Sequence, residues 1–212
     1  MTGTGQSQLT IAVDGPAASG KGTISRHLAD RYGLAYLDTG KLYRAVGALV
    51  LQGHAPEDAA QTLDPALLDD PVLRSPQVAK AASEVAAMPA VRAALLAFQR
   101  QFAVADNGAV LDGRDIGTVI CPDAPVKLFV TAAPEIRAAR RLSELQKAGH
   151  DTDFETVLED IRARDARDSG RADAPLKAAA DSVLLDTSDL DVAAALQAAT
   201  DRVEARLAER GI

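Results

Sequence analysis

The chain has 212 residues, of which 47% are hydrophobic and 25% are charged, and its formal net charge is -7 at pH 7. This length suits one domain, and the hydrophobic share is enough to bury a sizeable core. The acidic balance argues against nucleic acid or an anionic membrane as a partner, because both are bound through accumulated basic charge.

The first eight residues contain neither a basic start nor an apolar run, which predicts that no secretion signal is present. No apolar stretch approaches the roughly 20 residues that a membrane-spanning helix needs. The single cysteine, Cys121, cannot form an intrachain disulfide, so we expect a small buried side chain in a reducing compartment. These features favour a cytoplasmic protein.

Two strand and helix pairs open the chain. Residues 9–13 form a short β-prone run, and after a loop at residues 14–19 apolar residues recur at helical spacing over residues 20–31. Residues 35–37 then predict a second strand, and residues 40–52 predict a second helix.

Three later apolar runs, at residues 109–111, 126–131 and 182–185, predict three further strands. Strands that alternate with helices form parallel sheets with both faces covered. The sequence therefore predicts an α/β fold with a parallel five-stranded sheet flanked by helices. An amphipathic helix is expected over residues 190–210.

Two helical stretches stand outside this alternation. Residues 56–104 are rich in alanine and punctuated by prolines, and residues 134–172 are dense in arginine with a turn expected at residues 149–151. Neither contains a convincing strand. We expect both to be mobile elements over a rigid sheet, within a single domain over residues 1–212.

The loop after the first strand has the spacing of a phosphate-binding loop. It reads Gly15, Pro16, Ala17, Ala18, Ser19, Gly20 and Lys21. Glycines let backbone N–H groups converge on phosphate oxygens, the helix N-terminus adds partial positive charge, and Lys21 supplies a full charge. The alternative is a glycine-rich turn with a solvated lysine. The position between a strand and a helix favours a phosphate loop, and hence ATP.

The residue after Lys21 departs from the general phosphate loop. Serine or threonine usually contacts magnesium there, but this chain has Gly22, and the hydroxyl follows at Thr23. We therefore expect Mg²⁺ to be held mainly by phosphate oxygens and water, with Thr23 assisting. The order from Gly20 to Thr23 resembles the loop of nucleoside monophosphate kinases. A GTPase is disfavoured because Asn107 is followed by glycine and cannot begin a guanine-reading motif.

A second phosphate site is expected at the next helix start. Thr39 and Arg44 lie within about one and a half turns of each other there, and a helix N-terminus suits an anion. The alternative is ordinary N-capping by Asp38 or Thr39, with a solvated Arg44.

Two further charged clusters are expected at the same edge. Residues 112–115 read Asp-Gly-Arg-Asp and follow the third strand, at the carboxyl edge where parallel sheets bind ligands. Arg164, Asp168 and Arg171 are spaced i, i+4, i+7, so one helical face presents two guanidinium groups around a carboxylate. Arg167 can join that face. The alternative is a solvated row of ion pairs.

Together these segments resemble the bacterial cytidylate kinase family. The resemblance covers residues 11–23, 37–44, 81–92, 111–129 and 162–185. It is especially close in the runs Leu-Asp-Gly-Arg-Asp-Ile-Gly-Thr and Pro-Asp-Ala-Pro-Val-Lys. It implies ATP-dependent, Mg²⁺-assisted phosphorylation of CMP and dCMP to the diphosphates, in nucleotide salvage and pyrimidine metabolism.

The resemblance also implies three parts of the single domain. The kinase core comprises residues 9–52, 105–135 and 172–212, the monophosphate-binding lobe residues 53–104, and the lid residues 136–171. Many members carry a small β insert in this lobe, whereas here the region is short and helical. We therefore expect a smaller lobe.

Roles for single residues follow from the resemblance. The substrate-binding set is Thr39, Arg44, Ser83, Arg92, Gly113, Arg114, Asp115, Arg164, Asp168 and Arg171. Arg44, Arg114 and Arg164 are expected to hold the acceptor phosphate. Ser83, Arg92 and Asp115 would surround the cytosine, with Asp115 accepting from the exocyclic amine that uracil lacks, and Asp168 and Arg171 would face the ribose. A solvated side chain is expected for Lys41.

Phosphoryl transfer of this kind needs positioning and charge stabilisation, so we expect neither a general base nor a phosphoenzyme. The expected catalytic residues are Lys21, Arg44, Arg114 and Arg164. A lid drawn from residues 140–155 would bring Arg140 or Arg141 to the triphosphate. The histidines, His27, His54 and His150, share no spacing that suggests a metal site.

Two other functions remain open on the sequence alone. One is a kinase for another small acceptor, such as UMP or shikimate. The other is a nucleotide sensor without turnover, although a sensor has no need of a second phosphate pocket. For the cytidylate kinase hypothesis we expect a monomer whose partners are the small molecules ATP and CMP or dCMP.

Overall fold

The computed structural model describes residues 9–104 and 107–212. The expectation of no secretion signal in residues 1–8 lies outside the described residues, as do the first two residues of the core segment that begins at residue 105. All five predicted strands are present, and the predicted α/β class is confirmed.

The strands form one parallel sheet in the order β2-β3-β1-β4-β5. They are β1 (Thr10–Asp14), β2 (Ala35–Asp38), β3 (Ala109–Gly113), β4 (Val126–Thr131) and β5 (Val183–Asp186). The chain leaves β1 for β2 and β3 on one side, and later adds β4 and β5 on the other. This reversal puts a switch point at the carboxyl end of β1, where open α/β sheets bind ligands.

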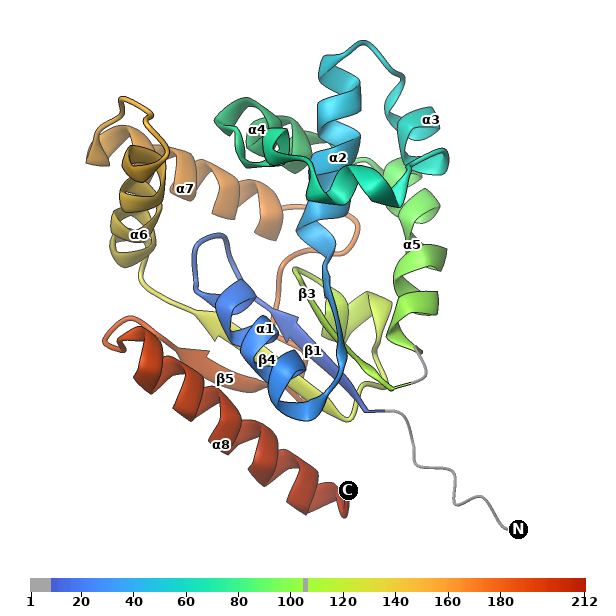
Figure 1. The fold of residues 1–212 in the computed structure, drawn as a ribbon, viewed down its shortest axis with the longest axis vertical. Coiled ribbons are helices and arrows are strands. Elements are labelled where there is room, and N and C mark those ends of the chain that lie inside the picture. Colours follow the sequence, from blue (N-terminus) through green and yellow to red (C-terminus); the bar gives the residue numbers. More distant parts are fainter. Residues whose placement is uncertain (1–8, 105–106) are drawn as a thin grey trace.

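Alternate residues of the strands pack against helices on opposite faces of the sheet (Figure 1). Ile11 and Val13 of β1 pack in one apolar cluster with α1 (Lys21–Tyr32) and α8 (Val192–Arg210). Ala12 belongs to the cluster on the other face, with α2 (Thr39–Leu51) and α5 (Pro89–Ala103). Cover on both faces explains why the strands are near-continuous apolar runs.

The stretch between α2 and β3 is helical, as predicted. It contains α3 (Pro56–Gln61), two short 3-10 helices (Pro65–Asp69 and Pro71–Arg74), α4 (Pro76–Val85) and α5. Each of these five elements begins at a proline, which suits a first helical position because the N–H there has no intrahelical partner. α4 crosses α2 so closely that a Cβ at Gly47 would lie 2.8 Å from the backbone nitrogen of Ala82.

The arginine-dense stretch forms two packed helices, α6 (Pro134–Lys147) and α7 (Phe154–Ser169), joined by a turn that contains Gly149. In Figure 1 they lie beside the loop between β1 and α1. Their apolar residues, among them Ala138 and Val157, cluster with Ala17 of that loop. The predicted lid helices therefore pack directly on the phosphate loop.

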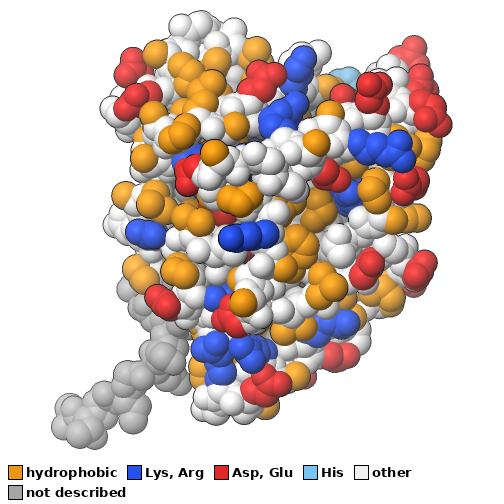
Figure 2. Space-filling view, turned by 180° about the vertical axis from the view of Figure 1, so that it is seen from behind, with side chains coloured by type: hydrophobic (Ala, Val, Ile, Leu, Met, Phe, Trp, Pro, Cys, Tyr) orange, Lys and Arg blue, Asp and Glu red, His pale blue; other side chains and the backbone are white. Residues whose placement is uncertain are grey.

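The surface carries no segregated charge on the face drawn in Figure 2, where basic, acidic and hydrophobic side chains are interspersed. Among the described residues, no single helix is long and apolar enough to cross a bilayer. α4 and α5 reach that length and composition only together, as a pair bent by 96°.

Candidate active site

The phosphate loop depends on residues with unusual backbone angles. Gly15 has φ 152°, and a Cβ there would lie 1.9 Å from the carbonyl oxygen of Val130, so only glycine fits where β1 ends. Gly20 has φ 88° at the N-cap of α1, and Ala18 adopts φ 57°, a left-handed conformation that is uncommon outside glycine. The loop therefore curls back over the N-terminus of α1.

Lys21 is the first residue of α1, and its side chain is only 12% exposed. This excludes a freely solvated lysine. Its Nζ lies 3.7 Å from Oδ1 of Asp112. Burial, and next the guanidinium of Arg114, lower the pKa of Lys21 to about 8, against the opposing effect of Asp112.

Asp112, the penultimate residue of β3, lies beside Gly22. The phenol of Tyr36 donates to Asp112 Oδ2 over 2.9 Å. A Cβ at Gly22 would lie 3.4 Å from that same oxygen and 3.7 Å from the phenol. A buried carboxylate thus occupies the space beside the position where other phosphate loops carry a hydroxyl, while Thr23 is exposed on the first turn of α1.

The start of α2 is not held by ordinary capping. Asp38, its N-cap, makes no side-chain cap hydrogen bond, and Thr39 Oγ1 donates instead to the carbonyl of Asp112 over 2.8 Å. A Cβ at Gly113 would lie 2.6 Å from that hydroxyl, so glycine is required there. Arg44 is half-buried and donates to Leu73 O over 3.0 Å. The alternative of N-capping with a solvated arginine is therefore wrong.

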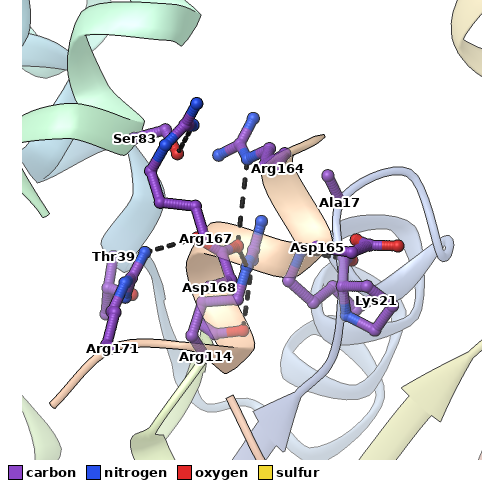
Figure 3. A network of polar contacts seen from close by, with 12 residues as sticks. Ala17, Lys21, Thr39, Ser83, Arg114, Arg164, Asp165, Arg167, Asp168 and Arg171 are labelled. Atoms are coloured by element: carbon purple, nitrogen blue, oxygen red, sulfur yellow. Dashed lines mark hydrogen bonds and ion pairs between the residues drawn. The ribbon is translucent and has the colours of Figure 1, made fainter. Parts of the chain in front are cut away.

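Asp168 on α7 is the centre of the charged network in Figure 3, and its side chain is 1% exposed. Arg114 Nε donates to its Oδ2 over 2.8 Å, and Arg171 Nη2 donates to its Oδ1 over 2.5 Å. Arg164 Nε lies 3.9 Å from Oδ2. Burial alone would raise the pKa of Asp168, but these three guanidinium groups hold it below its usual value. Arg171 lies beyond α7, which ends at Ser169, so the prediction that it shares a helical face with Arg164 and Asp168 is wrong. It reaches Asp168 from the segment after the helix, and the buried carboxylate excludes the solvated row of ion pairs.

The guanidinium groups outnumber the carboxylates that pair with them. Burial, and next the charge of Arg114, lower the pKa of Arg164 to about 9, and Arg44 and Arg141 act in the same direction. Burial also lowers the pKa of Arg44, to which Arg141 and Arg114 contribute. Like charges held this close to one another disfavour their own ionisation. Such an arrangement is suited to an anion with several negative oxygens.

The other end of this network is also polar and buried. Arg92 pairs with Asp115, and its Nη1 also donates to the phenol of Tyr43 over 3.3 Å. Ser83 Oγ accepts from Arg167 Nη1 over 2.7 Å. Nine of the ten predicted substrate residues line one pocket, namely Thr39, Ser83, Arg92, Gly113, Arg114, Asp115, Arg164, Asp168 and Arg171. Arg44 is not among the residues that line it.

The two candidate lid arginines differ in what they contact. Arg140 donates to Thr187 twice, to Oγ1 over 3.0 Å and to the carbonyl over 2.7 Å. Arg141 pairs with Glu144 over 3.1 Å and lies near enough to Arg44 and Arg164 to lower the pKa of each. Arg44, Arg114 and Arg164 form a guanidinium cluster, and of the two lid arginines only Arg141 belongs to it.

Several residues that shape the site were not singled out from the sequence. Arg137 of α6 donates to the carbonyl of Ala17 over 3.3 Å and pairs with Asp165 of α7 over 2.6 Å, so it ties the loop to both helices. Thr187 donates to the carbonyl of Ser19 over 3.0 Å. Asp14, also not singled out, ends β1; Asp38 ends the nearby strand β2, and Asp112 is the penultimate residue of β3 between them. That repetition at the carboxyl edge was a signal the sequence did contain.

Other residues stand apart from the site. Cys121 is half-buried, and burial raises the pKa of its thiol to about 11. Within residues 9–104 and 107–212 no group of three or more histidine, cysteine or carboxylate side chains could hold a metal ion. His27 lies 3.2 Å from the hydroxyl of Thr200, between α1 and α8.

A parallel sheet with a phosphate loop at its switch point and a guanidinium cluster beside that loop defines a P-loop kinase. Shikimate kinase from Bacteroides thetaiotaomicron has the same fold, with a TM-score of 0.53 at 12% identity over 94% of this chain and 98% of its own. The chain belongs to the cytidylate kinase family, whose model matches residues 11–205.

Relatives of that family match almost the whole chain. A cytidylate kinase from Xanthobacter autotrophicus is 62% identical over 208 residues, which cover 95% of this chain and 100% of the relative. One from Rhodospirillum rubrum is 58% identical over 204 residues, which cover 91% and 96%. The predicted family is therefore confirmed.

Proposed function

We propose that this protein transfers the terminal phosphoryl group of ATP to CMP and dCMP. One observation carries this proposal: the phosphate loop lies beside the guanidinium cluster. Lys21 Nζ is 3.7 Å from Asp112, and Arg114, two residues further along, shares the Asp168 carboxylate with Arg164. Arg114 and Arg164 accordingly both lower the pKa of Lys21. Two anions bound at these two places would meet at that lysine. A donor and an acceptor phosphate held side by side are what in-line transfer requires.

The donor would lie in the loop from Gly15 to Thr23, with Lys21 on its phosphates. Mg²⁺ fits this site because the Asp112 carboxylate, a hard oxygen donor, lies beside Lys21 and Gly22, and because Mg²⁺ usually keeps several waters and binds few protein ligands. The Thr23 hydroxyl, on the first turn of α1, would assist. When bound, the ion would neutralise negative charge on the phosphate groups. The chain's part is to orient those oxygens and to exclude water.

For the acceptor, Arg44, Arg114 and Arg164 would hold the phosphate, and Asp168 with Arg171 would face the ribose. Ser83, Arg92 and Asp115 would read the base. Asp115 is buried and pairs with Arg92 through Oδ2. A carboxylate has further lone pairs, and these could accept a hydrogen bond from an exocyclic amine. This arrangement favours cytosine over uracil.

Of the two lid arginines, we propose Arg141 for the transferred phosphoryl group. It already lies close to Arg44 and Arg164, whereas Nη1 and Nη2 of Arg140 each donate to Thr187. α6 and α7 would then act as the lid, and α3 to α5 as the monophosphate-binding lobe. Arg140 would hold the lid to the loop after β5.

We further propose that the protein works as a cytoplasmic monomer. All of the site residues named above come from one chain. A lone cysteine suits a reducing compartment.

ADP release with CMP, dCMP, UMP, AMP and shikimate in turn tests the proposal. We expect ADP to form rapidly with CMP and dCMP and at least about tenfold more slowly with UMP, as a lost hydrogen bond to a charged group predicts. Lys21→Met should abolish turnover and leave the fold intact. Nucleotide binding without ADP formation would support the sensor instead, and turnover of Lys21→Met near that of the wild type would contradict the role of this lysine.

A further inference from the structure

Asp14 is the last residue of the central strand β1 and directly precedes the phosphate loop. Its side chain is 4% exposed. Both carboxylate oxygens accept backbone hydrogen bonds, Oδ1 from the N–H of Ile116 and Oδ2 from the N–H of Gly117, each over 2.7 Å. None of the roles proposed above uses this carboxylate.

The surroundings of Asp14 make its ionised side chain unfavourable for the stability of the fold. No lysine or arginine forms an ion pair with it within the described part of the chain. Burial raises its pKa to about 7, the two N–H groups oppose that change, and the nearest charged side chains, Asp115 and Arg114, act in opposite directions. A buried carboxylate without a cation lowers folding stability, so its presence here points to a use.

The two N–H groups belong to the residues that directly follow Asp115. Residues Ile116–Ile120 form a π-helical turn, with Asp115 at its N-cap. At the other end of this turn Arg100 donates to the carbonyls of Val119 and Ile120, over 3.1 Å and 3.3 Å. The turn is therefore held at both ends.

Packing around the turn leaves little room for a shift. A Cβ at Gly117 would lie 3.3 Å from Asp14 Oδ2 and 3.1 Å from Cδ of Lys127. Contacts of this length are tighter than ordinary van der Waals contact. The backbone that carries Asp115 is thus fixed to the strand that leads into the phosphate loop.

We propose that Asp14 is a positioning residue for base recognition. It anchors the turn behind Asp115, so that the Asp115 carboxylate meets the exocyclic amine of the acceptor base at one fixed place relative to the phosphate loop. This inference rests on the proposed function, because it needs Asp115 to read the base. Asp14 itself touches neither substrate.

Asp14→Asn tests the proposal, because the amide keeps the shape but sets an NH₂ group against one of the two backbone N–H groups. We expect the ratio of kcat/KM for CMP to that for UMP to fall about tenfold, mainly through a higher KM for CMP, as expected when one hydrogen bond of a charged group is lost. The KM for ATP should change by less than about twofold, since the phosphate loop keeps its own contacts.

Thr10→Val is the matched control on the same strand. Thr10 lies at the other end of β1, and its hydroxyl donates to the carbonyl of Ala103 over 3.0 Å. Its replacement should lower the unfolding midpoint and leave the ratio of CMP to UMP unchanged. A purely structural role for Asp14 would make the two variants behave alike.

The outcomes separate this inference from the proposed function. A wild-type enzyme with no preference for CMP would refute the proposed function. A wild-type preference that persists in folded Asp14→Asn would refute only the positioning role, as would a KM for ATP that rises as much as that for CMP. Should Asp14→Asn not fold, Gly117→Ala presses a methyl group on Oδ2 and should shift the same ratio in the same direction; an unchanged ratio there would also overturn the inference.

Discussion

At the scale of single residues, Lys21 shows how surroundings set the pH at which a charge is available. Its pKa is lowered to about 8 because burial and Arg114 outweigh Asp112. The free enzyme therefore loses this proton above about pH 8. Since the ordinary pKa of a lysine is 10.5, the folded state binds fewer protons than the unfolded chain between pH 8 and pH 10.5, and Lys21 makes stability rise with pH in that window.

We predict that kcat/KM for ATP, measured at CMP well below its KM, falls as pH rises through about 8. That parameter reports on the free enzyme, whereas kcat should fall only at higher pH because bound triphosphate stabilises the protonated lysine. The corresponding fall for CMP should come later, since Arg164 has a pKa of about 9. Steady-state rates from pH 6.5 to 9.5 check this. A flat ATP profile up to pH 9 would contradict it.

Ala18 carries backbone strain in the phosphate loop, with φ 57°. A left-handed conformation costs an L-residue roughly 1–2 kcal/mol, and a β-branched residue tolerates it least. We predict that Ala18→Val lowers the unfolding free energy by about 1–2 kcal/mol, whereas Ala18→Gly stays within about 0.5 kcal/mol, because relieved strain is offset by a more flexible unfolded chain. Urea unfolding measures both. Equal losses would show that the backbone angle is not the cause.

At the scale of elements, the strands and helices could be predicted because each strand is a short apolar run that ends in a polar residue. The five prolines between residues 56 and 89 marked helix starts because proline fits the first helical turn. The sites at Thr39 and Arg164 followed from their positions at a helix start and on a helix face.

Contacts between distant elements could not be predicted in the same way. Arg137 reaches the carbonyl of Ala17 across 120 positions, and Asp14 reaches Ile116 across 102. Such contacts depend on strand order, which brings β1 between β3 and β4. Local spacing does not encode that order.

The contact between α7 and α4 rests on Arg167, whose guanidinium donates to Ser83 Oγ over 2.7 Å. A hydroxyl that accepts from a cation keeps its own proton free to donate. Arg167 therefore presents Ser83 as a donor, which matches the ring nitrogen or carbonyl of cytosine. Its contribution would be to acceptor binding rather than to the transfer step.

We predict that Arg167→Met raises the KM for CMP about tenfold with kcat changed by less than about twofold. Arg162→Met is the matched control, because Arg162 lies on the same helix but forms an exposed pair with Glu135 over 2.8 Å. Initial rates at varied CMP test both variants. A lower kcat at unchanged KM in Arg167→Met would assign this arginine to the transfer step instead.

At the scale of the whole molecule, the protein is acidic while its site is basic. The net charge is -7, yet Arg44, Arg114 and Arg141 gather around Arg164, and Arg114 and Arg164 in turn lie close to Lys21. Positive charge is thus concentrated where two phosphate groups would meet. This concentration of charge destabilises the ligand-free fold, because the guanidinium groups repel one another. The repulsion contributes to the lowered pKa of Arg44 and of Arg164.

Arg164 provides the test of this trade-off between stability and binding. Its pKa is lowered to about 9, so its charge at neutral pH is held against an unfavourable field. Arg164→Met keeps the length of the side chain and removes that charge. We predict that the ligand-free variant gains about 1–3 kcal/mol of unfolding free energy, because repulsion by Arg114, Arg44 and Arg141 is removed. Asp168 keeps its shorter pairs with Arg114 and Arg171.

The same substitution should remove the stabilisation by CMP. In the wild type, CMP at 100 times its Kd should stabilise the fold by about 2.7 kcal/mol, and most of that shift should be lost in Arg164→Met because the phosphate loses a partner. Thermal unfolding with and without CMP measures both effects, and Arg162→Met should change neither. A variant that is less stable without ligand and still stabilised by CMP would contradict the trade-off, since it would make Arg164 a structural residue rather than one kept charged for an incoming phosphate.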